Sequence, residues 1–157
     1  VDADGYMPWT TDLCRARDED PEMTNVYMEL GGVFGYSVIT HPDICGHLLG
    51  QLIRSFGADH VIWGTDCIWW GSPQWLIEAF RRFQIPQKLQ DKFGYAPITA
   101  EDRRLILGLN AARLYGVDVE AKRTEIPGDS LSTMKSDYTE QGADPSNTAY
   151  GWVPEAG

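Results

Sequence analysis

Long apolar runs, basic residues and cysteine are all scarce in this chain. No apolar stretch approaches the roughly 20 residues that a membrane-spanning helix needs, and the first residues lack the basic and apolar regions of a signal peptide. The chain has only 13 Lys and Arg residues against 23 Asp and Glu residues, which gives a formal net charge of −10. A surface of this charge repels nucleic acids and anionic membranes, so we expect neither as a partner.

The three cysteines, Cys14, Cys45 and Cys67, form no C-x-x-C pair and are odd in number. This pattern argues against a disulfide framework and favours a reducing compartment, so we expect a cytoplasmic protein. The first residue is Val rather than Met, which is typical of a sequence that begins inside a longer chain or of a processed one.

Acidic residues are concentrated at the two ends of the chain. Residues 1–25 hold seven acidic and two basic groups, residues 119–157 hold seven and three, and residues 26–118 are nearly balanced at nine and eight. At 157 residues and 43% hydrophobic composition the chain can bury one core. We therefore expect one folded domain over residues 1–118, followed by a polar C-terminal tail or surface arm over residues 119–157.

Two buried strands are predicted. Residues 25–30 are rich in β-favouring side chains and lead into Gly31-Gly32, where we expect a loop. Residues 60–66 form an apolar run that ends in Gly-Thr-Asp. Between them the apolar residues of 48–56 recur at helical spacing, with Gly57 in the position of a C-terminal cap. Strand, helix and strand in this order indicate a parallel pair with a right-handed crossover.

The second half of the chain is predicted to be helical. Ser72 and Pro73 form a helix start, with the helix ending near Pro86, and Thr99 and Asp102 form a capping-box-like start of a last helix. The fold class is therefore α/β in the order β-α-β-α-α. Two parallel strands cannot make a closed sheet, so we expect further strands from outside this sequence.

Three blocks of the sequence carry a resemblance to a known family. They are Asn25-Val-Tyr-Met-Glu-Leu-Gly-Gly32, Phe56-Gly-Ala-Asp-His-Val-Ile-Trp-Gly-Thr-Asp66 and Ile106-Leu-Gly-Leu-Asn-Ala-Ala-Arg-Leu-Tyr-Gly116. Together they resemble the end of an amidohydrolase-2 type metal-dependent hydrolase, a family of (β/α)₈ TIM barrels. The resemblance covers roughly residues 20–118 and implies strands seven and eight with the closing helix, an incomplete barrel, since a whole one needs about 250 residues.

By this resemblance Asp66 is the strand-eight aspartate, which lies beside a divalent metal, usually zinc, and handles the proton of a metal-activated water. Without this resemblance, Asp66 would be interpreted as an ordinary turn residue at a strand end. The family's metal-binding histidines have no counterpart here, because His41, His47 and His60 do not reproduce their pattern. The resemblance thus implies a metal as cofactor whose other ligands lie in preceding residues.

Several residues near the predicted strand ends are candidates for substrate binding. Trp69, Trp70 and Ser72 follow Asp66 on the same loop, where they would either line a substrate pocket or, for the two Trp rings, pack the top of the barrel. His41 follows the first strand and reaches the same face, although a loop residue at a helix entry needs no such role. Cys67 has two readings, a metal contact or a small buried apolar residue.

Three further polar residues have structural readings. Glu29 lies inside a predicted strand, so we expect it to pair with an Arg such as Arg54 or Arg113. Asn110 and Arg113 are predicted to hold the closing helix against the barrel.

The leading hypothesis is a metal-dependent hydrolase that acts on a small carboxylated or cyclic substrate. A non-oxidative decarboxylase of the same family is the alternative, because this sequence lacks the loops that separate the two. A second alternative, from a different class, is a non-catalytic subunit that completes a barrel with another chain. Expected partners are a small-molecule substrate and either a second copy of the chain, in a homo-oligomer, or the remainder of the barrel, with the acidic tail as an interaction arm.

Overall fold

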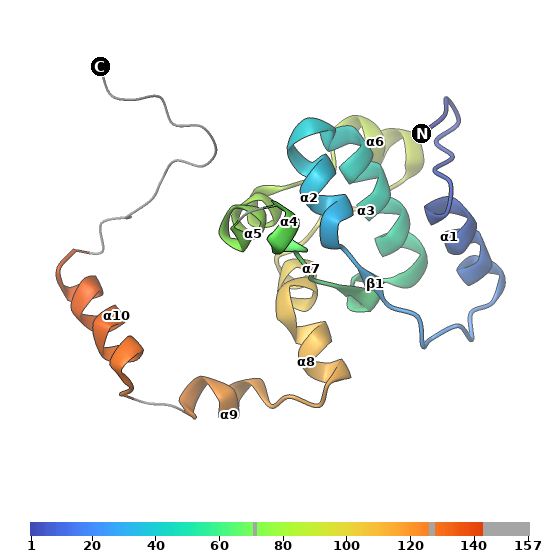
Figure 1. Cartoon of the computed structure of the whole chain (residues 1–157). Coiled ribbons are helices and arrows are strands. Elements are labelled where there is room, and N and C mark those ends of the chain that lie inside the picture. The colour runs from blue at the N-terminus through green and yellow to red at the C-terminus, as the bar shows by residue number, and fades with distance from the viewer. Residues whose placement is uncertain (71, 126–127, 143–157) are drawn as a thin grey trace, which may run out of the picture. The chain divides into compact units, whose positions relative to one another are not determined.

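The computed structural model describes residues 1–70, 72–125 and 128–142, and the chain divides into two compact units, Val1–Gly116 and Val117–Gly157 (Figure 1). The first unit holds the strands and most of the helices. In the second, the described residues form helices α9 (Val119–Thr124) and α10 (Ser130–Glu140). Asp118 and Asp129 cap these helices, each accepting a hydrogen bond from a backbone N–H in the first turn.

The first unit contains a parallel pair of short strands, β1 (Met28–Glu29) and β2 (Val61–Ile62), in the register Met28 to Val61 and Glu29 to Ile62. The parallel pairing is confirmed, but both strands are much shorter than the predicted runs. Beyond β2 the Trp63 N–H donates to the Ile106 carbonyl at 3.0 Å, which joins this segment to the helical residues Leu105–Leu109. The described residues are thus mostly helical, with two short parallel strands.

Two helices rather than one connect the strands. Helix α2 (Gly31–Thr40) begins directly after β1, and α3 (Pro42–Phe56) follows with Pro42 in its first turn and ends at Gly57, which has a positive φ of 85°. A 3₁₀ turn over Ala58–His60 then leads into β2. The predicted helix over 48–56 is confirmed as the second half of α3, whereas the loop expected at Gly31-Gly32 is wrong because α2 starts there.

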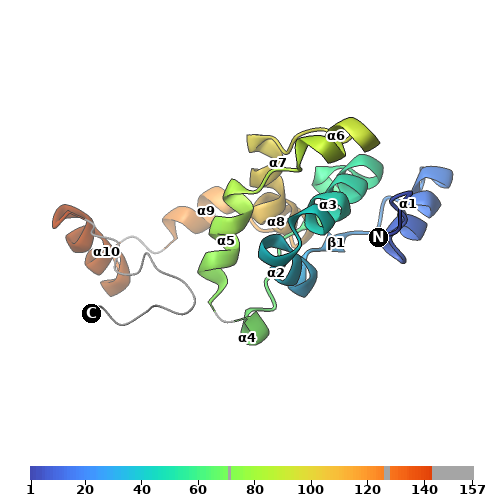
Figure 2. The same cartoon turned by 90° about the horizontal axis from the view of Figure 1, so that it is seen from above.

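The segment after β2 forms three helices, α4 (Cys67–Trp70), α5 (Pro73–Arg82) and α6 (Gln87–Phe93). Ser72 caps α5 by accepting a hydrogen bond from the Gln74 N–H, as predicted. Helix α2 lies between α3 and α5 (Figure 2), and the Phe34 and Phe80 rings meet edge to face with centroids 5.5 Å apart. This contact joins α2 to α5 across the core.

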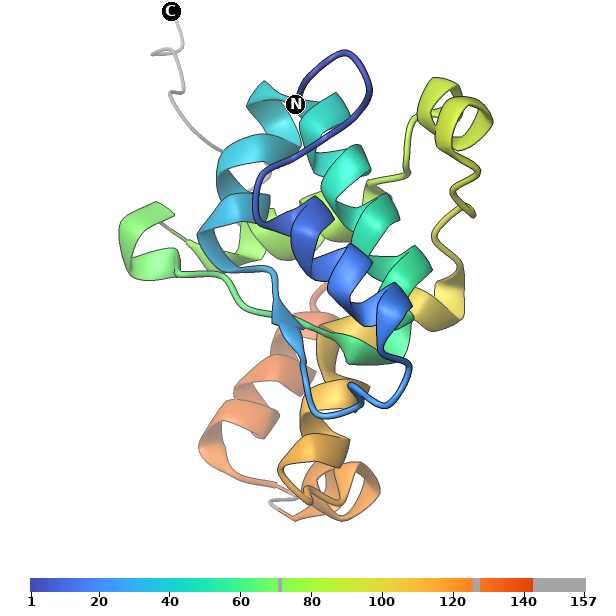
Figure 3. The same ribbon diagram turned by 90° about the vertical axis from the view of Figure 1, so that its right-hand side faces the viewer.

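Helix α1 (Thr10–Glu19), for which the sequence carried no prediction, packs along α3 (Figure 3). Its buried Cys14 belongs to the same core as Leu49 and Leu52. The N-terminal segment is therefore part of the folded unit.

The last helix of the first unit runs through α7 (Ala100–Arg104), a π-helical segment (Leu105–Leu109) and α8 (Asn110–Leu114). Thr99 and Asp102 form the predicted capping box, with each side chain accepting from the backbone N–H of the other. The buried core of the unit combines side chains from its helices, strand β2 and the connecting segments, among them Leu30, Phe34, Leu49, Val61, Leu76, Phe80, Ile98 and Ile106. Among the described helices there is none with the length and apolar character needed to span a bilayer.

Candidate strand-end site

Asp66 lies four residues beyond the end of β2, in the loop that leads to α4. Its backbone has a φ of +46°, a left-handed conformation that Asp tolerates better than most residues. The Asp66 Oδ2 accepts a hydrogen bond of 2.7 Å from the backbone N–H of Gly32, in the first turn of α2. The Asp66 carboxylate, which lies beyond the end of β2, is thereby turned toward the start of α2, the helix that follows β1.

Glu29, the last residue of β1, lies next to Asp66. Its Oε1 accepts a hydrogen bond of 3.1 Å from the Gly31 N–H. The successive backbone N–H groups of Gly31 and Gly32, at the start of α2, thus each bind one carboxylate. Partial burial raises the pKa of the Glu29 carboxyl, and the negative charge of Asp66 raises it further. The expected pairing of Glu29 with an Arg is wrong.

The two Arg residues named for that pairing lie elsewhere. Arg54 donates to the Phe93 carbonyl and Arg113 to the Asp59 carbonyl, and no ion pair of the described residues includes Glu29. The Glu29 carboxylate lies instead against the backbone of Gly31 and Gly64, beside Asp66. The neighbour of Glu29 is therefore a like charge, which sequence reasoning missed.

Two glycines leave room for these carboxylates. A Cβ on Gly31 would lie 2.6 Å from the Glu29 Oε2 and 2.8 Å from the Asp66 Oδ2, and Gly31 also has a positive φ of 39°. A Cβ on Gly64 would overlap the Glu29 Oε1. Both carboxylates thus lie against backbone at positions where only glycine fits without displacement, which explains the Gly-Gly and Gly-Thr-Asp endings of the two strands.

The two carboxylates are suitable oxygen ligands for a divalent cation. A bound cation would offset the repulsion between their two negative charges. A protein metal site normally uses three or more protein ligands. The part of the chain that the structure describes contains no group of three His, Cys, Asp or Glu side chains able to hold a metal. The donor chemistry fits a metal, but the described residues supply only a part of its ligands.

The other residues predicted for the site lie at different distances from it. Trp69 lies in α4 with 78% of its surface exposed, and the side chain of Trp70 is outside the described part of the structure. Ser72 is exposed and its hydroxyl oxygen caps α5. Cys67 is half-buried and is the first residue of α4, two positions before Trp69. A substrate-binding role for Trp69, Trp70 and Ser72 stays a prediction, and so does a metal contact of Cys67.

His41 lies between α2 and α3, exposed, with its Nδ1 2.9 Å from the Thr40 hydroxyl and its ring stacked on Tyr36 at 6.1 Å. It lines an open apolar cavity of about 460 Å³ together with Gly32, whose N–H binds Asp66. His41 and Gly32 thus line the same cavity. In the described hydrogen bonds the His41 ring contacts neither Glu29 nor Asp66. A role of His41 toward a substrate stays a prediction.

The fold and this site define a class of protein. One acidic side chain lies at the carboxyl end of β1 and one lies beyond the carboxyl end of its parallel neighbour β2, which is where ligands bind in α/β proteins. The amidohydrolase family model matches residues 17–117, well over half of the chain. The chain therefore belongs to the amidohydrolase family, as its sequence motifs predicted. A search of curated proteins and a search of solved structures found no match.

Proposed function

We propose that this chain contributes the last two strand-helix units of a metal-dependent hydrolase barrel that acts on a small carboxylated or cyclic substrate. The observation that carries the proposal is the position of Asp66, beyond the carboxyl end of β2 and turned toward the end of the parallel neighbour β1. In barrels of parallel strands this is the face on which chemistry takes place. Membership of the amidohydrolase family supports the same reading.

In the proposed site Asp66 acts both as a metal ligand and as the residue that accepts a proton from the attacking water and passes it on. A bound divalent metal, zinc in our proposal, would lower the pKa of water to about 7 and so supply a nucleophile at neutral pH. The Gly32 N–H holds the Asp66 Oδ2, and the described residues give Oδ1 no hydrogen-bond partner, so in the proposal Oδ1 takes up the proton. The positive φ of Asp66 supports a functional role, because strained backbone is retained at sites that use it.

The remaining metal ligands and strands would come from residues that precede this sequence in the protein, or from a second copy in a homo-oligomer. In the described structure β1 pairs only with β2, and an apolar groove of about 660 Å³ runs beside β1. Met28, Leu30, Val33 and Leu13 are among its lining residues. An unpaired strand edge beside an apolar groove supports the proposal that another strand of the barrel belongs there. We also propose a cytoplasmic location, for which the support is the odd number of cysteines without a C-x-x-C pair.

Metal analysis of the purified protein, with its intact mass, tests this function. We expect about one zinc per chain, as in catalytic zinc sites, in a protein large enough to hold the other ligands. Asp66→Asn should reduce the metal content and lower turnover by about 10²-fold or more, since a general base is lost with a ligand. Asp43→Asn is the control, because Asp43 is exposed and its ion pair in the described structure is with Lys88.

Two results would contradict the proposal: a protein of full barrel mass that binds no metal, or an Asp66→Asn variant with the metal content and turnover of the unchanged protein. Release of carbon dioxide without uptake of water would assign the same site to the decarboxylase alternative.

A further inference from the structure

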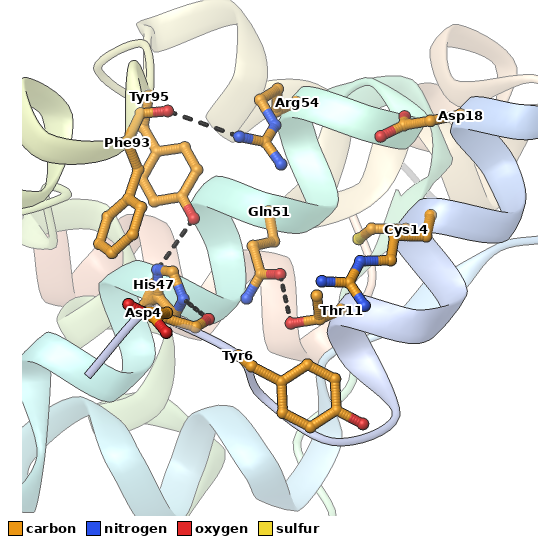
Figure 4. Close-up of a pocket in the computed structure, with 12 residues that line it drawn as sticks. Asp4, Tyr6, Thr11, Cys14, Asp18, His47, Gln51, Arg54, Phe93 and Tyr95 are labelled. Atoms are coloured by element: carbon orange, nitrogen blue, oxygen red, sulfur yellow. Dashed lines mark hydrogen bonds between the residues drawn. The ribbon is translucent and has the colours of Figure 1, made fainter. Parts of the chain in front are cut away.

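A cavity of about 270 Å³ lies between the N-terminal segment, α1, α3 and the end of α6 (Figure 4). None of its lining residues comes from β1, β2 or the loops that follow them. One water molecule accounts for about 30 Å³ of liquid, so this volume admits a molecule of several heavy atoms. The cavity is therefore a possible binding site separate from the strand-end carboxylates.

One wall of the cavity is held in place by His47, which is only 3% exposed. Its Nε2 lies 2.5 Å from the Gly5 carbonyl oxygen and therefore carries the ring proton, since a carbonyl only accepts. Its Nδ1 accepts from the Tyr95 hydroxyl at 2.8 Å. Because both nitrogens are engaged, His47 positions the N-terminal segment and the Tyr95 ring but has no nitrogen left for a ligand.

Gln51, one turn further along α3, does have an uncommitted group. The Met7 N–H donates to the Thr11 hydroxyl oxygen, so the Thr11 hydroxyl donates in turn to the Gln51 Oε1 at 2.7 Å. The side-chain nitrogen of Gln51 then faces away from Thr11, and it has no hydrogen-bond partner among the described residues. Gln51 is 3% exposed, and a buried donor without a partner costs stability unless a ligand or water satisfies it.

The charged residues that line the cavity have both signs. Arg54 lies over the Tyr95 ring at 5.5 Å and forms no ion pair in the described structure, and neither do Asp4 and Asp18. Arg15 makes a long contact of 3.9 Å with Asp12, and its guanidinium lies over the Tyr6 ring at 5.7 Å. Two positive and two negative groups, each with little or no internal pairing, are complementary to a ligand that itself carries both charges.

Aromatic rings supply the apolar part of the lining. Phe93 and Tyr95 are stacked with centroids 5.6 Å apart, and Tyr6 contributes a third ring. Gln51 and Arg54 lie three residues apart on α3, and both line the cavity. Each side chain carries hydrogen-bond donors, and a carboxylate has two oxygens that can accept from them.

From this geometry we propose that the cavity binds an aromatic amino acid as the free zwitterion. The carboxylate is bound by Arg54 and the Gln51 side-chain nitrogen, the ammonium group is bound by Asp18 or Asp4, and the apolar side chain packs on the aromatic rings. The proposal is independent of the strand-end site and does not involve Asp66.

Isothermal titration of the full chain with L-phenylalanine tests the proposal. We expect saturable binding to one site, and binding at least about tenfold weaker for 3-phenylpropionate and for phenethylamine, which each lack one charged group. Arg54→Met should weaken L-phenylalanine binding by a similar factor. Arg54 is exposed on α3, so this variant should keep its fold, which its melting temperature verifies.

Arg81→Met is the matched control, since Arg81 is an exposed α5 residue outside the cavity. The control and Asp66→Asn should both bind L-phenylalanine as the unchanged chain does. Absence of saturable binding overturns the proposal, and so does an Arg54→Met variant of unchanged affinity. Loss of binding in Asp66→Asn alone would place the ligand at the strand ends and would also overturn it.

Discussion

The side-chain amide of Asn110 donates a hydrogen bond of 2.7 Å to the carbonyl oxygen of Val61. The same nitrogen donates to the Ala58 carbonyl at 2.8 Å, so one side chain of α8 binds both the turn before β2 and the strand itself. Arg113 adds a bond to the Asp59 carbonyl at 2.7 Å. The strand that leads to Asp66 is thereby held by the closing helix, as predicted for Asn110 and Arg113.

Asn110→Asp should therefore destabilise the protein strongly. The substitution keeps the shape of the side chain but replaces the donor by an acceptor, which would face two buried carbonyl oxygens. We expect the free energy of unfolding to fall by about 3 kcal/mol or more, measured by urea denaturation. Asn25→Asp, the same change at an exposed position, should cost little. Equal losses for the two variants would contradict the anchoring role.

Gly50→Ala should also destabilise the fold, for a steric reason. Gly50 lies in α3 directly under the Tyr95 ring, and an added Cβ would overlap that ring. We expect a loss of about 1–3 kcal/mol, the usual cost of overpacking a core. Gly108→Ala is the control, because no atom lies within 4 Å of its added Cβ, and it should leave the melting temperature unchanged or slightly higher. A Gly50→Ala variant as stable as this control would argue against the close packing.

The three cysteines should differ sharply in reactivity. Burial raises the pKa of the Cys45 thiol to about 12 and also raises that of Cys14, whereas Cys67 is half-exposed. Because the thiolate is the reactive form, iodoacetamide at pH 8 should modify Cys67 first in the native protein. Peptide mass spectrometry after brief treatment measures this order, with urea-unfolded protein, in which all three react, as the reference. Rapid modification of Cys45 under native conditions would be inconsistent with its burial.

Stability should decrease at alkaline pH. Burial raises the pKa of Cys45 and of the Tyr95 hydroxyl to about 12 each, above the values of about 8.5 and 10 expected in the unfolded chain. Between these values the unfolded chain has lost protons that the native protein retains, so the free energy of unfolding falls as pH rises from about 8.5 toward 12. Below that range these two groups do not change it.

Urea denaturation at successive pH values checks the alkaline decrease. Cys45→Ala should show a shallower decrease with pH. Leu49→Ala, a buried variant without a titratable group, should lose stability equally at every pH. A Cys45→Ala variant with the full alkaline slope would show that this thiol does not contribute to it.

Features that depend on neighbouring residues could be predicted from the sequence. Ser72 with Pro73 and Thr99 with Asp102 start helices as expected, because a cap is a hydrogen bond between residues two or three positions apart. The apolar spacing of 48–56 likewise identified α3, although its start at Pro42 was missed. Helix α2 was missed because two glycines mark its first turn, and its stability comes from burying Phe34 and Val38 rather than from helix propensity.

The sequence by itself determined the family, the parallel pairing of two strands and the placement of Asp66 at a strand end. Only the tertiary structure decided what lies beside Asp66. Glu29 is 37 positions away in the sequence, and it approaches Asp66 because β1 and β2 pair in one register and Gly31 and Gly64 leave space for the carboxylates. Contacts between distant residues depend on register and packing, which no local pattern encodes, and this is also why the pairing of Glu29 with an Arg was the wrong expectation.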